Sequence, residues 1–268
     1  MTVAILGAGV MGEAILSGLV HAGRQVSEIL VTDRRPERAV ELTERYGVEV
    51  VDNPTAVKRA DTVLVVVKPQ DMNALMDEIR PSVRPGQLIV SLAAGITTAY
   101  VESRLPPGVA VVRVMPNTPA LVDEGMAAIS AGSHCDEVHL REAEELLSST
   151  GRVARVPEQQ LDAVTAISGS GPAYVFYVVE AMIEAGVHMG LPRATATEFV
   201  VQTLVGSAKL LRETGEHPTV LRERVTSPGG TTAAALRLLE DGKVRADFLA
   251  AMQAARDRSR ALSSGEAV

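Results

Sequence analysis

The sequence is poor in the residues on which several kinds of site depend. Its 268 residues include one cysteine, no tryptophan and only 3% aromatic residues. A single cysteine excludes an intramolecular disulfide and favours a reducing compartment, the cytoplasm. Scarce aromatic rings argue against stacking of a large aromatic substrate and favour a small aliphatic one. The sequence also lacks HExxH, CxxC and any spaced acid cluster, so no metal site is expected.

Positive charge is scarce as well. The net charge is −7, and the densest basic group is the short run of Arg34 and Arg35 with Arg38. No nucleic-acid partner is expected, because phosphate neutralisation needs a basic surface. The longest apolar stretch, from Ala173 to Val187, is interrupted by two glutamates, so we interpret it as a buried helix and expect no membrane partner. No secretion signal is recognised at the start of the sequence.

The first half of the sequence alternates short β-branched runs with helical segments. This alternation predicts an α/β Rossmann-like domain with a parallel sheet, helices on both faces and right-handed crossovers. Beyond about residue 157 the strand pattern stops, which predicts a dinucleotide-binding domain over 1–155 and an all-α domain over 156–268. Strands are expected at 2–6, 28–32, 48–50, 62–67, 87–91 and 109–114, with edge strands at 126–130 and 153–156.

Two long helices are expected at 172–189 and 192–214, and both are apolar on more than one face. A helix that is apolar nearly all round must be covered on all sides. The remainder of the second half offers little material for this, so we expect these helices to interlock with a second subunit in a homo-oligomer.

A glycine-rich turn follows the first predicted strand and opens a helix. Gly7 allows a tight turn, Gly9 allows close approach of a pyrophosphate, and Gly12 allows close packing of helix on strand. At the first strand–helix junction of an alternating half, this pattern predicts a nicotinamide dinucleotide site. The expected contacts are the residues of the turn: Gly7, Ala8, Gly9, Val10, Met11 and Gly12.

The end of the second predicted strand carries a mixed signal for the cofactor. Asp33 could accept hydrogen bonds from the ribose 2′-hydroxyl of NADH, whereas Arg34 and Arg35 could hold the 2′-phosphate of NADPH. Arg35 and Arg38 could also simply form the solvated face of the next helix. Arg34 favours NADPH, and Asp33 keeps NADH open.

Two later strand ends should border the same crevice, because carboxyl ends of parallel strands form the ligand site in such folds. One is followed by Val67-Lys68-Pro69 and the other leads to Ala93-Ala94-Gly95. Small residues at 93–95 would let the nicotinamide side of the cofactor pass close to the backbone. Lys68 could be a catalytic acid, a cofactor contact or a surface residue capping the strand.

Two glycine-rich loops are expected in the second half. One is 168–172, and the other is 226–232, just before a strongly helical run. In the second loop Gly229 and Gly230 have no side chains to block an approaching anion. The hydroxyls of Ser227, Thr231 and Thr232 lie next to a helix N-terminus. This arrangement suits a small carboxylate, although a plain helix cap would use some of the same residues.

Several motifs, in order along the chain, resemble pyrroline-5-carboxylate reductase over essentially the full length. The matching segments are 5–12, 67–69, 93–95, Met115-Pro116-Asn117-Thr118-Pro119, Asp162-Ala163-Val164-Thr165, 168–174, Met189-Gly190-Leu191-Pro192 and 225–232 with Leu238-Leu239-Glu240. The resemblance implies an interlocked dimer that commonly assembles into decamers. It also implies hydride transfer from NAD(P)H to the C=N carbon of Δ1-pyrroline-5-carboxylate, giving L-proline.

The same resemblance implies roles for individual residues. Asn53 would lie near the adenosine ribose, Asn117 among the cofactor contacts and Glu158 near the substrate loop. Arg224 stands where some members carry asparagine, so it is left out of the expected site. Thr232 would hydrogen-bond the ring nitrogen, and the substrate carboxylate would be held by Ser227, Gly229, Gly230 and Thr231.

Two other functions remain open from the residues alone. A β-hydroxyacid dehydrogenase-like enzyme also joins a Rossmann half to a helical half, but its catalytic lysine would have to be Lys209, which has no surrounding motif. A dinucleotide-binding regulator without turnover would have no need for the loop at 226–232.

Overall fold

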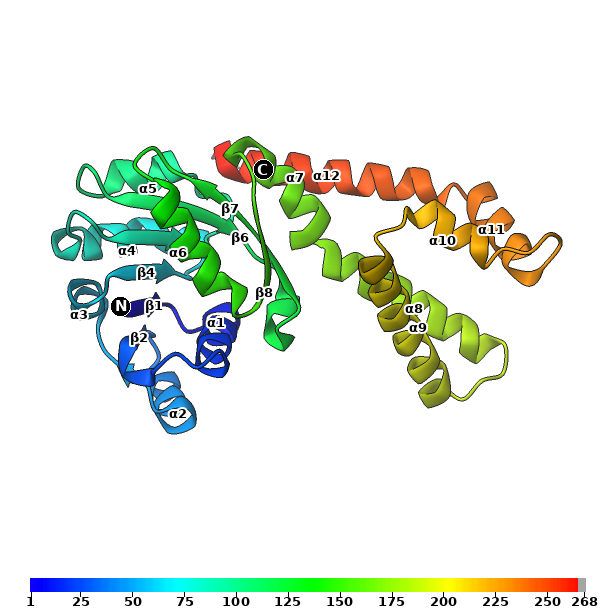
Figure 1. Cartoon of the computed structure of the whole chain (residues 1–268), viewed down its shortest axis with the longest axis horizontal. Helices are drawn as coiled ribbons and strands as arrows, with labels where there is room; N and C mark the ends of the chain where they lie inside the picture. The colour runs from blue at the N-terminus through cyan, green and yellow to red at the C-terminus, as the bar shows by residue number, and fades with distance from the viewer. Residues whose placement is uncertain (265–268) are drawn as a thin grey trace. The chain divides into compact units, whose positions relative to one another are not determined.

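The computed structural model describes residues 1–264 and divides into two compact units (Figure 1). The first unit comprises Met1–Ser170 together with the chain from Ala255 onward, and the second comprises Gly171–Ala254. The last strand ends at Arg155, where the sequence places the domain boundary, whereas the two compact units divide between Ser170 and Gly171. Helical segments beyond that strand are added to the first unit before the second begins.

An eight-stranded sheet forms the centre of the first unit, with the order β3-β2-β1-β4-β5-β6-β7-β8. The first six strands are parallel, which is the doubly wound arrangement predicted from the alternating pattern. The strands are β1 (Val3–Leu6), β2 (Ile29–Thr32), β3 (Glu49–Val50), β4 (Thr62–Val65), β5 (Leu88–Ser91), β6 (Ala110–Met115), β7 (Gly125–Ala131) and β8 (Gly151–Arg155).

Strand β7 runs antiparallel to β6, whereas β8 is parallel to β7. The sequence predicted both strands but not this reversal. The link between β6 and β7 holds only the short 3₁₀ segment η4 (Thr118–Val122). A parallel connection needs a crossover of a dozen or more residues, so this link can only return the chain in the opposite direction.

Helices cover both faces of the sheet, and alternate residues of each strand supply the two cores. Val3 and Ile5 of β1 pack on the face covered by α1, α2 and α6, whereas Ala4 and Leu6 pack on the face covered by α3, α4 and α5 (Figure 1). The helices are α1 (Val10–His21), α2 (Pro36–Tyr46), α3 (Asn53–Arg59), α4 (Met72–Ile79), α5 (Thr98–Arg104), α6 (Glu137–Ser148) and α7 (Leu161–Val164).

The first expected glycine-rich loop, 168–172, is wrong, because all of this stretch except a bend at Ser170 is helical. A single helical run extends over Glu158–His188, with a π-helical segment at Thr165–Gly169. The Ser170 N–H donates to the Thr165 carbonyl at 2.8 Å. Pro172, four residues after Ser168, has no N–H to donate to the Ser168 carbonyl, and the Asn117 amide donates to this carbonyl instead at 3.1 Å. The glycines at this point therefore widen the helix without ending it.

The second unit is entirely helical and buries few side chains. Gly186 of α8 packs against Ala196 of α9, and a Cβ on Gly186 would lie 3.0 Å from the Ala196 methyl carbon. The apolar stretch of α8, expected to be buried, is exposed in the single chain; Phe176 is 66% exposed. By length and composition alone, the run 158–188 could also span a membrane. The helices are α8 (Gly171–His188), α9 (Arg193–Thr214), α10 (Pro218–Arg224), α11 (Thr231–Asp241) and the first half of α12 (Val244–Ser264), whose second half belongs to the first unit.

Candidate functional site

The glycine turn between β1 and α1 has the close contacts that its sequence predicted. Gly7 has φ of +99°, its N–H donates to the Thr32 carbonyl at 3.1 Å, and a Cβ on it would lie 2.7 Å from the Val66 carbonyl oxygen. A Cβ on Gly12 would lie 2.1 Å from the Gly7 carbonyl oxygen. Gly7 and Gly12 are therefore required by the fold.

Gly9 differs from the other two glycines of the turn. No atom lies within 4 Å of the place where its Cβ would be, so the space beside it is open to a ligand. Gly9 is also the N-cap of α1 and supplies no side chain to the first amides of the helix. Free N–H groups and the positive end of the helix dipole together make an anion site.

A cleft of 540 Å³ begins at this turn and follows the carboxyl ends of the parallel strands. Its size suits a dinucleotide, and the open side of Gly9 lies within its lining. The residue-level predictions that line it are Gly7, Gly9, Asp33, Arg34, Asn53, Val67 and Lys68.

Asp33 and Arg35 form the most extensive polar contact of this cleft. The Asp33 carboxylate accepts hydrogen bonds from the Arg35 backbone N–H at 2.9 Å, from Nε at 3.0 Å and from Nη2 at 3.1 Å. Burial raises the pKa of Asp33, but these bonds from Arg35 outweigh burial and hold the pKa below its ordinary value. Asp33 is therefore a carboxylate at neutral pH whose oxygens are already engaged.

The neighbouring arginine points to a different partner. Arg34 Nη1 donates to Asp71 at 3.1 Å, and the Arg34 side chain is 65% exposed. Lys68 also lines the cleft, and no hydrogen bond or ion pair of its side chain occurs within the described residues. Two arginines and a lysine thus carry the positive charge of this cleft.

Asn53 sits at the start of α3 and joins three elements. Its Oδ1 accepts from the Thr32 hydroxyl at 2.6 Å, and its Nδ2 donates to Glu78 at 3.0 Å. These bonds fix the orientation of the amide, and Asn53 lines the cleft.

Other predicted cofactor contacts lie outside the lining of this cleft. Ala8 and Ala93 are buried, and Gly95 packs near Leu262 of α12, which lies 3.5 Å from the place of a Gly95 Cβ. Those outside the lining are Ala8, Val10, Met11, Gly12, Pro69, Ala93, Ala94, Gly95 and Asn117.

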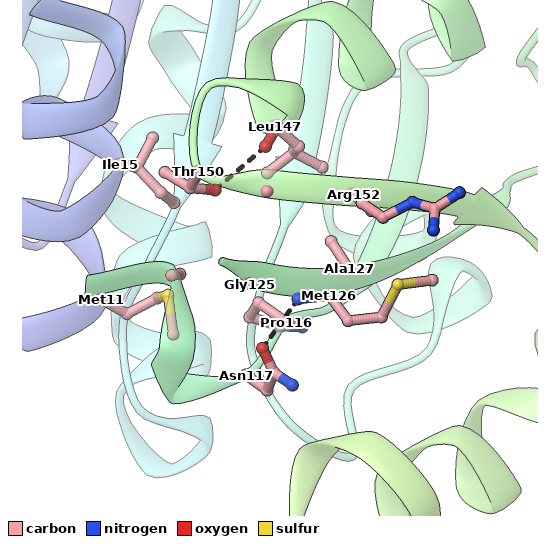
Figure 2. A pocket seen from close by; sticks show the side chains of 12 residues that line it. Met11, Ile15, Pro116, Asn117, Gly125, Met126, Ala127, Leu147, Thr150 and Arg152 are labelled. Carbon is pink, nitrogen blue, oxygen red and sulfur yellow. Dashed lines mark hydrogen bonds between the residues drawn. The ribbon is translucent and has the colours of Figure 1, made fainter. Parts of the chain in front are cut away.

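Met11 and Asn117 instead line a separate small cavity of 10 Å³, next to the starts of β7 and β8 (Figure 2). Both ends of the Asn117 amide are engaged. Its Oδ1 accepts from the Met126 N–H at 2.8 Å, as drawn in Figure 2, and its Nδ2 donates to the Ser168 carbonyl. Asn117 therefore ties the turn before β7 to the π-helical segment, and its side chain has a structural task.

Comparison with known proteins decides between the possible functions. The chain is 46% identical to a pyrroline-5-carboxylate reductase of Corynebacterium melassecola, over 97% of this chain and 98% of that one. The chain belongs to the pyrroline-5-carboxylate reductase family. Residues 158–262 match the family model described as pyrroline-5-carboxylate reductase dimerisation, and residues 2–95 match one described as NADP oxidoreductase, coenzyme F420-dependent.

Solved structures of pyrroline-5-carboxylate reductases have the same fold. One from Coxiella burnetii superposes with a TM-score of 0.93 at 36% identity, and covers 98% of both chains. One from Plasmodium falciparum, with NADP bound, superposes with a TM-score of 0.89 at 27% identity, again over 98% of both chains. This chain is accordingly a nicotinamide-dependent oxidoreductase with a Rossmann-like domain and a helical dimerisation domain.

The loop that the family resemblance assigns to the substrate lies in the second unit, ahead of α11. Gly229 has φ of +70°, and Gly230 is the N-cap of α11 without a capping side chain. The Gly230 N–H donates to the Ser227 carbonyl at 3.0 Å, which closes the turn. Within the described residues, no hydrogen bond is made by the hydroxyls of Ser227, Thr231 and Thr232. The loop thus offers free hydroxyls and helix amides to an anion.

Two further side chains that the family resemblance concerns make contacts within their own units of this reductase. Glu158 accepts from the Thr98 N–H at 2.8 Å, from the Thr98 hydroxyl at 2.7 Å and from the Arg113 guanidinium at 3.1 Å. It thereby supports the start of α5 and neutralises a buried arginine. Arg224, which the sequence leaves out of the expected site, forms a two-pronged ion pair with Glu216.

Sequence reasoning missed part of the cleft. The sequence indicates Arg35 through its position just after β2, whereas Asp71 has no motif of its own and only its position after β4 could have indicated it. The remaining unpredicted lining residues follow strand ends or face them from α4: Thr32, Val51, Asp52, Val66, Gln70, Leu75 and Glu78. No cluster of His, Cys, Asp and Glu side chains able to hold a metal ion occurs in residues 1–264.

Proposed function

We propose that this protein reduces Δ1-pyrroline-5-carboxylate to L-proline with NADPH, the last step of proline biosynthesis. The observation that carries the proposal is that this member of the family has two helix N-termini without a capping side chain. Gly9 is the N-cap of α1, and Gly230 is the N-cap of α11. The first suits a pyrophosphate, and the second suits a small carboxylate.

The residues of the first unit would bind and orient the dinucleotide. Backbone groups of the glycine turn would hold the pyrophosphate, and Asn53 would contact the adenosine ribose. Arg34, more than half exposed on the cleft, favours NADPH because a guanidinium pairs with a phosphate through several N–H donors. The segments 67–69 and 93–95 would lie toward the nicotinamide, and the bound dinucleotide would supply the hydride.

The residues of the loop before α11 would bind and orient the imine. Backbone groups of Gly229, Gly230 and Thr231, with the Ser227 hydroxyl, would hold the carboxylate. The Thr232 hydroxyl would hydrogen-bond the ring nitrogen. The C=N carbon gains a hydride and the nitrogen gains a proton. Because a protonated cyclic imine is already electrophilic, the chain needs to supply position more than acid strength.

The reductase would work as an interlocked homodimer, with further assembly into a decamer. The support is the match of 158–262 to the dimerisation family, together with the exposed apolar side chains of α8. A cytoplasmic location is proposed because a chain whose one cysteine is Cys135 forms no internal disulfide.

The deciding experiment is a steady-state assay of NADPH oxidation with Δ1-pyrroline-5-carboxylate, run beside NADH. We expect turnover that depends on the imine, with a higher kcat/KM for NADPH. Turnover with β-hydroxyacids in its place would favour the dehydrogenase alternative, in which Lys209 would have to act, although Lys209 is 71% exposed and pairs with Glu213. Tight cofactor binding with no turnover on either substrate class would favour a regulator.

A further inference from the structure

We propose that Asp33 does not receive the cofactor ribose, and instead acts as a fixed counter-ion that aims Arg35 at the 2′-phosphate of NADPH. Arg34 and Arg35, here called the arginine pair, would then form the selective site together. This inference rests on the proposed use of NADPH. It concerns Asp33, whose position just after β2 would ordinarily indicate NADH, and Arg35, which the glycine-turn motif does not include.

The first step of the argument is the state of the Asp33 carboxylate. A ribose-binding acid must present its oxygens to the two ribose hydroxyls. Here three N–H donors of Arg35 occupy those oxygens, and the Asp33 side chain is only 8% exposed. Asp33 could receive a ribose only by breaking a charge-assisted, two-pronged pair, which is among the stronger hydrogen-bond arrangements in proteins.

The second step is what the pair leaves available on Arg35. A guanidinium carries five N–H donors in a rigid plane, and Asp33 engages Nε and Nη2. The Nη1 group remains, on a side chain that is 62% exposed and lines the cleft. Because two contacts to Asp33 fix the plane of the guanidinium, little side-chain entropy is lost when a phosphate binds the remaining edge.

The third step is the second arginine. Arg34 donates to Asp71 through Nη1 alone, so its Nε and Nη2 stay available beside the same cleft. Asp33 and Asp71 thus hold the arginine pair from two sides. A dianionic phosphate, which accepts several hydrogen bonds at once, matches this set of donors, whereas a ribose hydroxyl offers no charge to it.

Kinetics with both cofactors test the inference. Arg35→Met and Asp33→Asn should each lower kcat/KM for NADPH by about 10-fold, mainly through KM, while kcat/KM for NADH changes less than about 3-fold. Compared with Arg35→Met, Arg35→Lys should recover part of the NADPH preference, because lysine supplies a positive charge but lacks the planar set of N–H donors of the guanidinium. The control is Arg59→Met, which breaks a two-pronged pair with Glu49 outside the cleft and should leave both cofactors unaffected.

The outcomes separate this inference from the proposed cofactor. A wild-type enzyme that prefers NADH contradicts the NADPH assignment and the inference with it. A wild type that prefers NADPH, with Arg35→Met behaving as Arg59→Met does, overturns the inference alone. It is also overturned if Asp33→Asn loses activity with NADH and keeps it with NADPH, because Asp33 would then be the ribose acceptor.

Discussion

Gly9 and Gly12 stand three residues apart in the cofactor turn and face different surroundings. A Cβ on Gly12 would meet the Gly7 carbonyl oxygen at 2.1 Å, which neither backbone segment can avoid without moving. A Cβ on Gly9 would meet nothing within 4 Å, and the φ of −69° at Gly9 is open to alanine. One glycine therefore serves the fold, and the other keeps room for the ligand.

Alanine at each glycine should separate these roles. Gly9→Ala should leave the melting temperature within about 2 °C of wild type and weaken NADPH binding about 10-fold or more, because the new methyl occupies the approach of the pyrophosphate. Gly12→Ala should lower the free energy of unfolding by about 3 kcal/mol. Thermal unfolding and cofactor titration measure the two effects. A Gly9→Ala protein that binds NADPH normally would remove the pyrophosphate from this turn.

Thr232 is the residue on which the proposed catalysis depends most directly. Its hydroxyl has no hydrogen-bond partner in the part of the chain that the structure describes, so its loss should not affect folding. Thr232→Ala should lower kcat/KM for the imine about 10- to 100-fold, the effect of one well-placed hydrogen bond of about 1.5–3 kcal/mol. Thr232→Ser, which keeps the hydroxyl, is the control. Equal kinetics for the alanine and serine variants would contradict the assigned role.

Sequence reasoning at the residue scale reached the backbone roles better than the side-chain contacts. The glycine turn follows from steric limits on φ and on close approach, and these are local. The partners of Glu158 are not local, since it contacts Thr98 and Arg113 across the fold. The partner of Asp33 is only two residues away, but the sequence pattern alone does not show that Arg35 rather than a ribose takes its oxygens. Which partner a polar side chain contacts depends on residues that come close to it only in the folded chain.

At the scale of helices, the carboxylate of Glu13 links α1 to α2 through hydrogen bonds. Glu13 of α1 accepts hydrogen bonds from Arg38, from Arg45 at 2.9 Å and from the Tyr46 hydroxyl at 3.0 Å, all on α2. Leu42 is the one fully buried side chain of α2, so this polar contact is a large part of what holds that helix. Burial raises the pKa of Glu13, but Arg38, Tyr46 and Arg45 together hold it below 4.5.

This lowered pKa predicts a pH-dependent stability. A carboxylate whose pKa is lower in the folded state contributes stability above its unfolded pKa and loses it as the pH falls through the folded value. Glu13→Gln should therefore lower the free energy of unfolding by about 1–3 kcal/mol at neutral pH, and by progressively less as the pH falls below 4.5. Urea unfolding of both proteins at several pH values measures the difference. A difference that stays constant with pH would contradict the assignment.

The order of strands and helices was predictable because the spacing of apolar residues distinguishes strands from helices, and turn and capping residues mark where each element ends. The features that were not predictable arise where elements meet. The reversal of β7 follows from a short link after β6, and the Ser168 carbonyl, which Pro172 leaves without a helical N–H partner, accepts a hydrogen bond from Asn117, far away in the sequence. Gly169 and Pro172 suggest a break locally, yet a proline in a first helical turn is also compatible with a continuing helix, and tertiary contacts decide between the two.

At the scale of the whole molecule, the second unit is incomplete as a single chain. Along α8 the exposed fractions reach 66% for Phe176 and 75% for Tyr177, and few residues of this unit are buried. Large apolar side chains seldom stay exposed together in a soluble monomer. Membership of the dimerisation family supplies the partner: a second copy of the same chain, whose helices would cover these surfaces.

Placing a charge on this surface tests whether a second copy covers it. Phe176→Glu should shift the protein toward monomer in light scattering and lower its melting temperature, because an interface would have to bury an unpaired carboxylate. Val40→Glu is the matched control, since Val40 is 57% exposed on α2 of the Rossmann unit and should leave the oligomer intact. Loss of the dimer in both variants would point to general destabilisation. An unchanged dimer in Phe176→Glu would show that α8 is covered in some other way, and the apolar face of this helix would then need a different explanation.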